Sequence, residues 1–338
     1  MAFYCQRMGV LRFLLAVAVL AHYSAPIVPG VPMLDGNVAV EGFFIISGFY
    51  MALILSGPYV GRPAEFYAAR ALRIYPMYWI VLAAAVAGLL WRGGRLEVPA
   101  MDLGTMLFVV ASNLLLFGQD VMQFLRVGPD GALALDLSRS DIGATLKLLP
   151  VPQAWTLALE LTFYAFAPWL ARLQTRWLIA LALASFALRQ LGLYFGFWGA
   201  WTYYFFPMQL GFFVAGMISY RAYRAIGAIP ASLGVAALLV VSAMTFMGDV
   251  PRISTMFYAA LVLCLPAIFE VSKTWRWDDA IGQLSYPIYL CHLAVIEFLS
   301  GPYPPLALAA SVAVSIALIF ATAPVERMRL RLRRGSTR

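Results

Sequence analysis

Long apolar runs dominate the sequence and restrict its fold more than any other feature. A helix needs roughly 20 apolar residues to cross the hydrocarbon core of a bilayer. Only 12% of the 338 residues are charged, whereas soluble domains carry about 25%. The chain is therefore predicted to be a single all-α polytopic membrane domain over 1–338, and an ordinary soluble enzyme is excluded. Eleven candidate segments lie near 9–28, 38–57, 74–91, 103–118, 153–171, 177–195, 201–220, 228–247, 253–271, 284–300 and 305–323.

Basic residues in the short connections orient these segments. The net charge of +8 is read as a topology signal and not as a nucleic-acid site, because the basic residues sit in short clusters between apolar runs. The positive-inside rule places the following clusters in the cytoplasm: Arg62, Arg70 and Arg73; Arg172 and Arg176; Arg221 and Arg224; Lys273 and Arg276; and Arg327 to Arg334.

Eleven full crossings contradict these assignments. Three segments separate Arg73 from Arg172, where an even number of crossings is required. The segment 103–118 is the shortest and contains polar residues, so we expect it to dip into the membrane and return, with its backbone covered by protein. Ten crossings then remain, with both termini and the basic tail 325–338 in the cytoplasm.

The only two histidines, His22 and His292, both fall within predicted membrane segments. Ionisable groups there are costly and usually mark a site, and imidazole suits proton transfer near neutral pH. His22 should lie about 15 Å along the helix from Arg12, near the middle of the membrane. A lone membrane histidine is also often a packing residue, and this interpretation is favoured for His292. The cysteines follow no metal or redox spacing, so no disulfide and no metal site is expected.

Arg70 and Arg73 stand three residues apart at the cytoplasmic end of a segment. Two guanidinium groups on one helix face can grip phosphates bidentately, although the positive-inside rule alone would also explain them.

Two acidic residues also fall in or at predicted segments. Glu41 opens a run in which Ser47 and Gly48 allow close helix contact, and it can also be a simple interfacial charge. Glu160 has no local basic partner, so its partner must come from another helix. If that partner is Arg189, the pair would be a purely structural bridge.

Five motifs occur in order over about residues 9–326: LRFLLAVAVLAH, VEGFFIISGF, ARALRIYP, WTLALELTFY and LSYPIYLCH. Together they resemble the acyltransferase-3 family of integral membrane acyltransferases. The resemblance implies a multi-pass enzyme of the bacterial inner membrane. It further implies transfer of an acetyl group from cytoplasmic acetyl-CoA to a hydroxyl of an extracytoplasmic glycan, lipid-linked sugar or related acceptor.

Carried over residue by residue, the resemblance assigns the following roles. His22, Glu41 and Glu160 are the candidate catalytic residues, Arg12, Arg70 and Arg73 are the candidate donor-binding residues, and Tyr289 with His292 matches the late Tyr-x-x-His. One departure affects Arg12. Nine residues separate it from His22, where the family has ten, so the two side chains should lie some 80° apart around the helix. Either a kink restores the facing, or Arg12 contributes less here.

The mechanism expected from this resemblance has coenzyme A phosphates on Arg70 and Arg73 and the thioester near His22. His22 would act as general base or as acyl relay, and Glu41 or Glu160 would orient its ring. The outer loop 119–152 would recognise the acceptor. A secondary transporter or flippase is the rival interpretation, although the internal repeats common in transporters are absent. A structural or assembly subunit is a third possibility.

Overall fold

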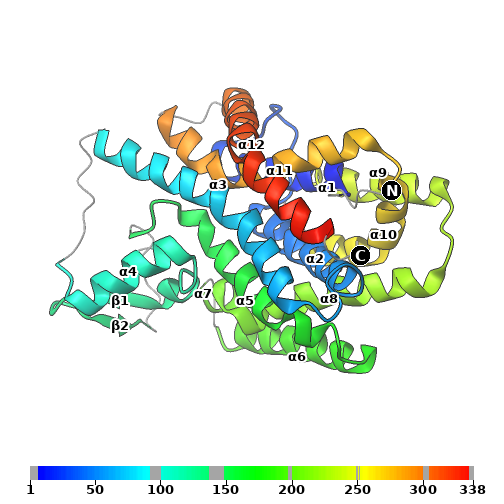
Figure 1. Ribbon diagram of the computed structural model, residues 1–338, viewed down its shortest axis with the longest axis horizontal. Coiled ribbons are helices and arrows are strands. Elements are labelled where there is room, and N and C mark those ends of the chain that lie inside the picture. The colour runs from blue at the N-terminus through cyan, green and yellow to red at the C-terminus, as the bar shows by residue number, and fades with distance from the viewer. Residues whose placement is uncertain are drawn as a thin grey trace.

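The computed structural model describes residues 7–91, 100–136, 148–196, 200–248, 250, 252–299 and 304–334. Part of the predicted outer loop, 137–147, and the end of the tail, 335–338, lie outside these residues. The described chain is almost entirely helical (Figure 1). Its α-helices are α1 Gly9–Ser24, α2 Gly36–Leu55, α3 Pro63–Trp91, α4 Leu103–Leu115, α5 Trp155–Leu170, α6 Thr175–Tyr194, α7 Ala200–Tyr204, α8 Phe206–Ile226, α9 Ala231–Met244, α10 Ile253–Ser272, α11 Arg276–Phe298 and α12 Pro304–Arg334.

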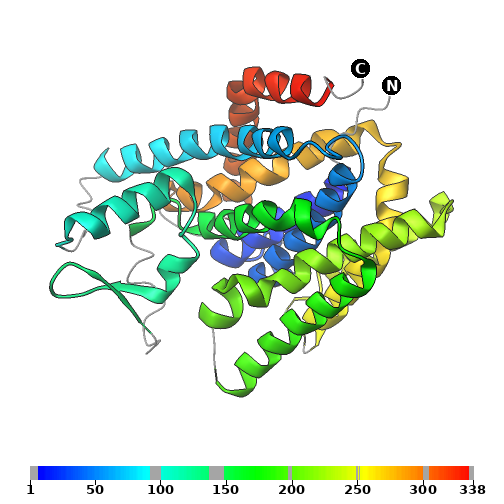
Figure 2. The same cartoon turned by 60° about the horizontal axis from the view of Figure 1, so that its bottom comes forward.

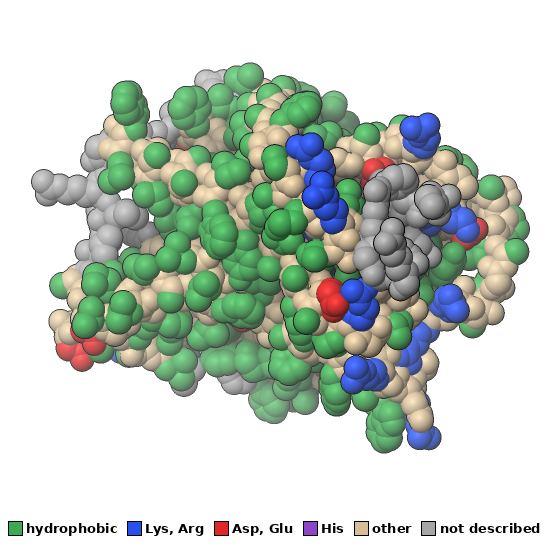
Figure 3. Space-filling model, in the orientation of Figure 1, with side chains coloured by type: hydrophobic (Ala, Val, Ile, Leu, Met, Phe, Trp, Pro, Cys, Tyr) green, Lys and Arg blue, Asp and Glu red, His purple; other side chains and the backbone are tan. Residues whose placement is uncertain are grey.

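Five of the described helices are long and apolar enough to cross a bilayer: α2, α3, α6, α10 and α12. Three shorter helices, α1, α4 and α9, are also apolar. Large hydrophobic side chains cover much of the outer surface (Figure 3), as expected when lipid is the solvent. The prediction of an all-α polytopic membrane protein is therefore confirmed.

Helix α2 runs through the centre of the bundle and packs most closely against α8 (Figure 1). A Cβ atom on Gly48 would lie 1.8 Å from the carbonyl oxygen of Phe213, and one on Gly216 would lie 1.9 Å from that of Ile45. Only glycine permits this approach of the two backbones. The close helix contact expected at Ser47 and Gly48 is thus confirmed.

Several helices start or end at one end of the bundle, and they carry basic residues there. The backbone N–H groups of Gly9 and Val10 donate to the carboxylate of Asp278, at 2.7 and 3.0 Å, which ties the start of α1 to the start of α11. Arg221, near the end of α8, donates to the carbonyl of Ala171 at 3.1 Å, in the turn between α5 and α6. Blue side chains gather on this side in Figure 3. We call it the basic end.

The opposite end of the bundle holds the end of α1, the start of α2 and the end of α9. There the N–H of Leu34 donates to the carbonyl of Thr245 at 2.8 Å. The predicted first segment, 9–28, is helical only as far as Ser24, because the following residues include Pro26 and Pro29. We call this the far end.

Helix α4 occupies the segment for which a dip and return is predicted. It has 13 residues, is about 20 Å long, and is the shortest of the apolar helices α1, α4 and α9. Its last turn meets the middle of α3, where Tyr75 donates to the carbonyl of Leu115 at 2.6 Å and Trp79 to that of Leu114 at 2.9 Å.

The chain then leaves α4 through a 3-10 turn, Val121–Phe124, and a hairpin of β1 Leu125–Val127 and β2 Leu133–Leu135. The protein cover expected for this segment is incomplete, because Leu107 and Val110 on the outward face of α4 are exposed. The helix satisfies its own backbone hydrogen bonds, so that face does not need cover.

Candidate functional site

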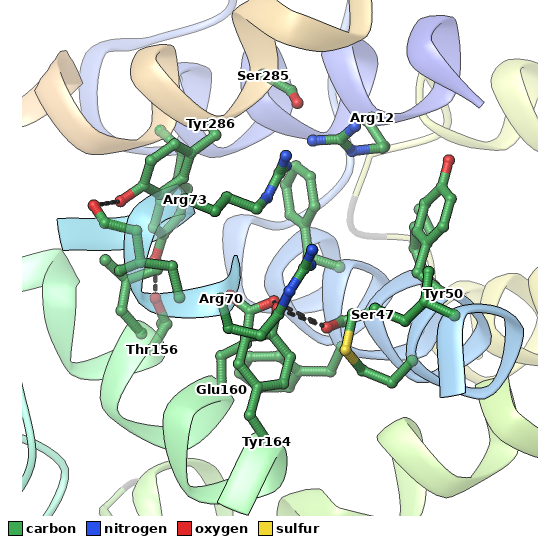
Figure 4. Close-up of a pocket in the computed structure, with 18 of the residues that line it drawn as sticks. Arg12, Ser47, Tyr50, Arg70, Arg73, Thr156, Glu160, Tyr164, Ser285 and Tyr286 are labelled. Atoms are coloured by element: carbon green, nitrogen blue, oxygen red, sulfur yellow. Dashed lines mark hydrogen bonds between the residues drawn. The ribbon is translucent and has the colours of Figure 1, made fainter. Parts of the chain in front are cut away.

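A cavity of about 160 Å³ opens near the basic end, and four arginines line it. Arg12 comes from α1, Arg70 and Arg73 from α3, and Arg329 from α12 (Figure 4 labels the first three). The structure therefore brings together all three arginines that the sequence singled out for donor binding. Arg329 was missed as a site residue, because in sequence it is one of many basic residues in the tail.

The positive charge of this cavity exceeds the negative charge that faces it. The Arg70 guanidinium lies 6.0 Å from the ring centre of Tyr164, and its Nε is buried without a hydrogen-bond partner among the described residues. Among the described residues that line the cavity, Glu160 carries the one carboxylate, and Glu326 binds Arg329 from outside that lining. Four guanidinium groups thus face two carboxylates, so the cavity suits an anionic ligand.

Glu160 stands in the cavity wall and is held by two hydroxyl groups. Ser47 donates to its Oε1 at 2.8 Å, and Tyr164 donates to the same oxygen (Figure 4). The alternative in which Glu160 pairs with Arg189 is wrong. Ser47 belongs to another helix, α2, whereas Tyr164 lies one turn after Glu160 on the same helix, α5.

Glu41 is only 1% exposed and accepts three side-chain bonds. Arg189 Nη1 lies 2.5 Å from Glu41 Oε1, Gln209 Nε2 donates to the same oxygen at 3.1 Å, and Tyr258 donates to Oε2. The interpretation of Glu41 as an interfacial charge is therefore wrong. Arg189 does form a buried bridge, but with Glu41: α6 packs against α8, and the Arg189 side chain reaches from there to the start of α2.

His22 lies in the last turn of α1, at the far end of the bundle. Its side chain is 35% exposed, and its Nδ1 lies 3.2 Å from Oδ2 of Asp35, which is 30% exposed. Helix α1 ends two residues later, and the position of His22 in the middle of the membrane stays a prediction. His22 is also absent from the lining of the arginine cavity.

Asp35, which the sequence analysis did not select, is the carboxylate beside His22. It caps α2 by accepting from the N–H of Asn37 at 2.8 Å, and the hydrogen bond from His22 lowers the pKa of Asp35. The expectation that Glu41 or Glu160 orients this imidazole is therefore wrong. An Asp directly before an apolar run is a helix-start signal, but only the fold shows that this cap meets His22.

Gly36 makes this approach possible. A Cβ atom there would lie 2.8 Å from the Cβ of His22, so a larger residue would push the start of α2 away from the end of α1.

A row of rings connects the cavity to His22. Tyr289 lines the cavity, and its ring centre lies 5.8 Å from that of His292. The ring of Tyr23 follows at 5.5 Å from His292 and 5.1 Å from His22. His292 is fully buried, and its Nδ1 donates to the carbonyl of Tyr289 at 2.7 Å. These contacts agree with the packing role favoured for His292, although its function is untested.

Arg12 and His22 face different surroundings, as their spacing predicts. Arg12 is buried and lines the cavity, whereas His22 is partly exposed at the far end. Helix α1 contains no proline. Arg12 therefore shares the cavity with the two arginines of α3. No proline kink turns its side chain towards His22.

No group of three or more His, Cys, Asp or Glu side chains that could hold a metal ion occurs among the described residues.

The helices form a many-helix membrane bundle with a cavity that four arginines line, an arrangement suited to an anionic ligand. The chain matches the acyltransferase domain of the acyltransferase-3 family over residues 7–325 and belongs to that family. It is therefore a multi-pass membrane acyltransferase that uses an acyl donor.

One curated relative is similar to part of the chain. The exopolysaccharide production protein ExoZ of Rhizobium meliloti (strain 1021) is 34% identical over 130 residues. That stretch covers 38% of this chain and 32% of ExoZ, so the match spans about a third of each protein. No solved structure matches the chain.

Proposed function

We propose that this protein is a membrane O-acetyltransferase that moves an acetyl group from cytoplasmic acetyl-CoA to a hydroxyl of an extracytoplasmic carbohydrate. The observation that carries the proposal is the convergence of Arg12, Arg70 and Arg73 on one buried cavity at the basic end. Coenzyme A carries its phosphates at one end and its thioester at the other. A cationic cavity can therefore hold the nucleotide while the thioester arm extends towards the far end.

The positions of the helix ends support ten crossings. The start of α1 and the last turns of α12 both reach the arginine cavity, through Arg12 and Arg329, so an even number of crossings separates them. Helix α4 ends against the middle of α3 and is the segment that does not cross. With the basic end in the cytoplasm of a bacterial inner membrane, both termini are cytoplasmic.

The thioester arm of the donor runs from the arginines past Tyr289 and Phe43 towards the far end. Both side chains line the cavity, and their ring centres lie 6.1 Å apart. Beyond Tyr289 follow the rings of His292, Tyr23 and His22, so the arm must pass Tyr289 to bring the acetyl carbon to His22.

The pair of His22 and Asp35 supplies the acid–base chemistry. Nδ1 of His22 donates to the Asp35 carboxylate, which leaves Nε2 as the basic nitrogen. Nε2 removes the proton from the acceptor hydroxyl as that oxygen attacks the thioester carbonyl. The carbon–sulfur bond then breaks, the acetyl ester forms, and the coenzyme A thiolate receives the proton from the imidazolium. Glu160 and Glu41 hold helices in place in this scheme.

The acceptor enters from the side opposite to the donor. The partial exposure of His22 and Asp35 leaves the catalytic pair open to a ligand at the far end. The relationship to ExoZ, an exopolysaccharide production protein, favours a polysaccharide or a lipid-linked precursor. The loop 119–152 is the proposed recognition element, of which the stretch 137–147 lies outside the described residues.

The test of this function is coenzyme A binding and acetyl-CoA turnover by the purified chain. Arg70→Ala and Arg73→Ala should each raise the KM for acetyl-CoA by roughly tenfold to hundredfold, because each loses charge-assisted bonds to phosphate. Arg176→Ala removes an exposed arginine of the basic end that does not line the cavity, so it is the matched control and should leave KM unchanged.

Two outcomes would contradict the proposal. One is the absence of coenzyme A release from acetyl-CoA, which would favour the transporter interpretation. The other is equal KM values for the Arg70, Arg73 and Arg176 variants, which would remove the cavity from donor binding.

A further inference from the structure

Helix α12 changes direction near its end. Pro324 lies inside this helix, and an internal proline removes a backbone hydrogen bond and bends the helix. Figure 2 shows the last turns of α12, in red, running across the direction of the part before them. The bend carries the basic sequence after Pro324 back over the bundle, beside the start of α3.

Arg329 is the residue of this bent end that points inwards. Its side chain is 13% exposed, and it lines the same cavity as Arg12, Arg70 and Arg73. Its neighbours Arg327 and Arg331, on either side in the sequence, are exposed. The bend therefore turns Arg329 towards the cavity and leaves Arg327 and Arg331 facing the surroundings.

Glu326 fixes the orientation of the Arg329 side chain. The Arg329 Nε donates to Glu326 Oε2 at 2.7 Å, and Nη2 donates to Oε1. This pairing uses one edge of the planar guanidinium, which has five N–H donors in all. The N–H donors of Nη1 are not used by Glu326, so they can bind a ligand while the carboxylate holds the side chain in place.

We propose that Arg329 is a fourth donor-binding residue and that the bent end of α12 closes the mouth of the cavity over the phosphates of the donor. The inference rests on the proposed function, because it takes the anion in the cavity to be coenzyme A. It assigns to the C-terminal segment a role in substrate binding. Glu326 is a positioning residue in this arrangement.

The experiment measures coenzyme A affinity for the full chain in a neutral detergent. Arg329→Ala should weaken binding by roughly tenfold to hundredfold, as expected for the loss of charge-assisted hydrogen bonds. Arg329→Lys keeps the charge but loses the planar fork, so it should fall between Arg329→Ala and the wild type. Arg331→Ala is the matched control from the same helix and should change affinity less than twofold.

A donor without phosphates separates ligand binding from a structural role. S-acetylpantetheine has the thioester arm of acetyl-CoA but no phosphate. Turnover of this donor should be the same in the wild type and Arg329→Ala, whereas a general loss of folding would lower it. If Arg329→Ala fails to fold, Arg329→Lys provides the same comparison between the two donors.

The outcomes distinguish this inference from the proposed function. If Arg70→Ala and Arg73→Ala weaken coenzyme A binding and Arg329→Ala does not, Arg329 is not a donor residue and the proposed function stands. If none of the three matters, the donor site itself is wrong. An effect of Arg329→Ala that appears only in vesicles with anionic lipid would mean that Arg329 binds a lipid headgroup, which also overturns the inference.

Discussion

The two ends of the bundle differ in how their charged side chains are paired. At the basic end, four arginines line one cavity; Glu160 is the carboxylate among its described lining residues, and Glu326 pairs with Arg329. At the far end, His22 is paired with Asp35, and Arg189 with Glu41 deeper in the bundle. An excess of buried cations favours the binding of an anion, whereas a matched imidazole–carboxylate pair is suited to moving a proton. In the proposed function, this difference places donor binding at one end and chemistry at the other.

The largest expected effect tests the far end. His22→Ala should lower kcat by about 10²- to 10⁴-fold, the usual contribution of a general base, and leave coenzyme A affinity unchanged. Steady-state turnover and direct binding on the same preparation check both parts. His22→Gln is the matched variant that keeps a polar side chain but cannot act as a base. A variant with unchanged kcat would remove His22 from the mechanism.

The next largest effect concerns the buried bridge between Glu41 and Arg189. Arg189→Met should lower the free energy of unfolding by about 3–5 kcal/mol, because it leaves the Glu41 carboxylate buried and uncompensated. Combining it with Glu41→Gln should recover much of that loss. Thermal unfolding in detergent measures both. If Arg189→Met instead lowers turnover with no loss of stability, Glu41 belongs to the chemistry and the division between the two ends fails.

The smallest effect concerns the pH dependence of the His22–Asp35 pair. Since the pKa of Asp35 is lowered by the hydrogen bond from His22, its ionised form stabilises the fold above the ordinary Asp pKa of about 3.9. That contribution is lost as pH falls through the lowered value. Asp35→Asn should therefore be less stable than the wild type near pH 7, by about 1 kcal/mol or less at this exposure.

Thermal midpoints of the wild type and Asp35→Asn, measured from pH 7 down to pH 3, check this prediction. The two midpoints should approach each other at the acidic end. A difference that stays constant over this range would show that the charge of Asp35 does not stabilise the fold.

Much of the arrangement at the basic end could be predicted from the sequence. Arg70 and Arg73 are three residues apart on a helix, and that spacing alone puts them on one face. Gly48 in a membrane segment similarly indicated a close helix contact, which α8 provides. These predictions succeeded because each depends on positions within a single helix.

The arrangement at the far end was predicted less well. The length of the first helix was overestimated because the apolar run continues past Ser24, although Pro26 and Pro29 interrupt the helix. Asp35 could not be recognised from the sequence because its signal is that of an ordinary helix cap just outside the membrane segment.

The amino-acid sequence by itself determined that the chain forms apolar membrane helices. The length of each apolar run and the position of the charges around it are local properties, so they do not depend on how the helices pack. The tertiary structure alone decided which charges meet. Arg189 pairs with Glu41, which lies 148 positions away in the sequence. The bend at Pro324 brings Arg329 to the cavity. Such pairs depend on how each helix is tilted and rotated about its axis, and these angles are set by the packing of all its neighbours together.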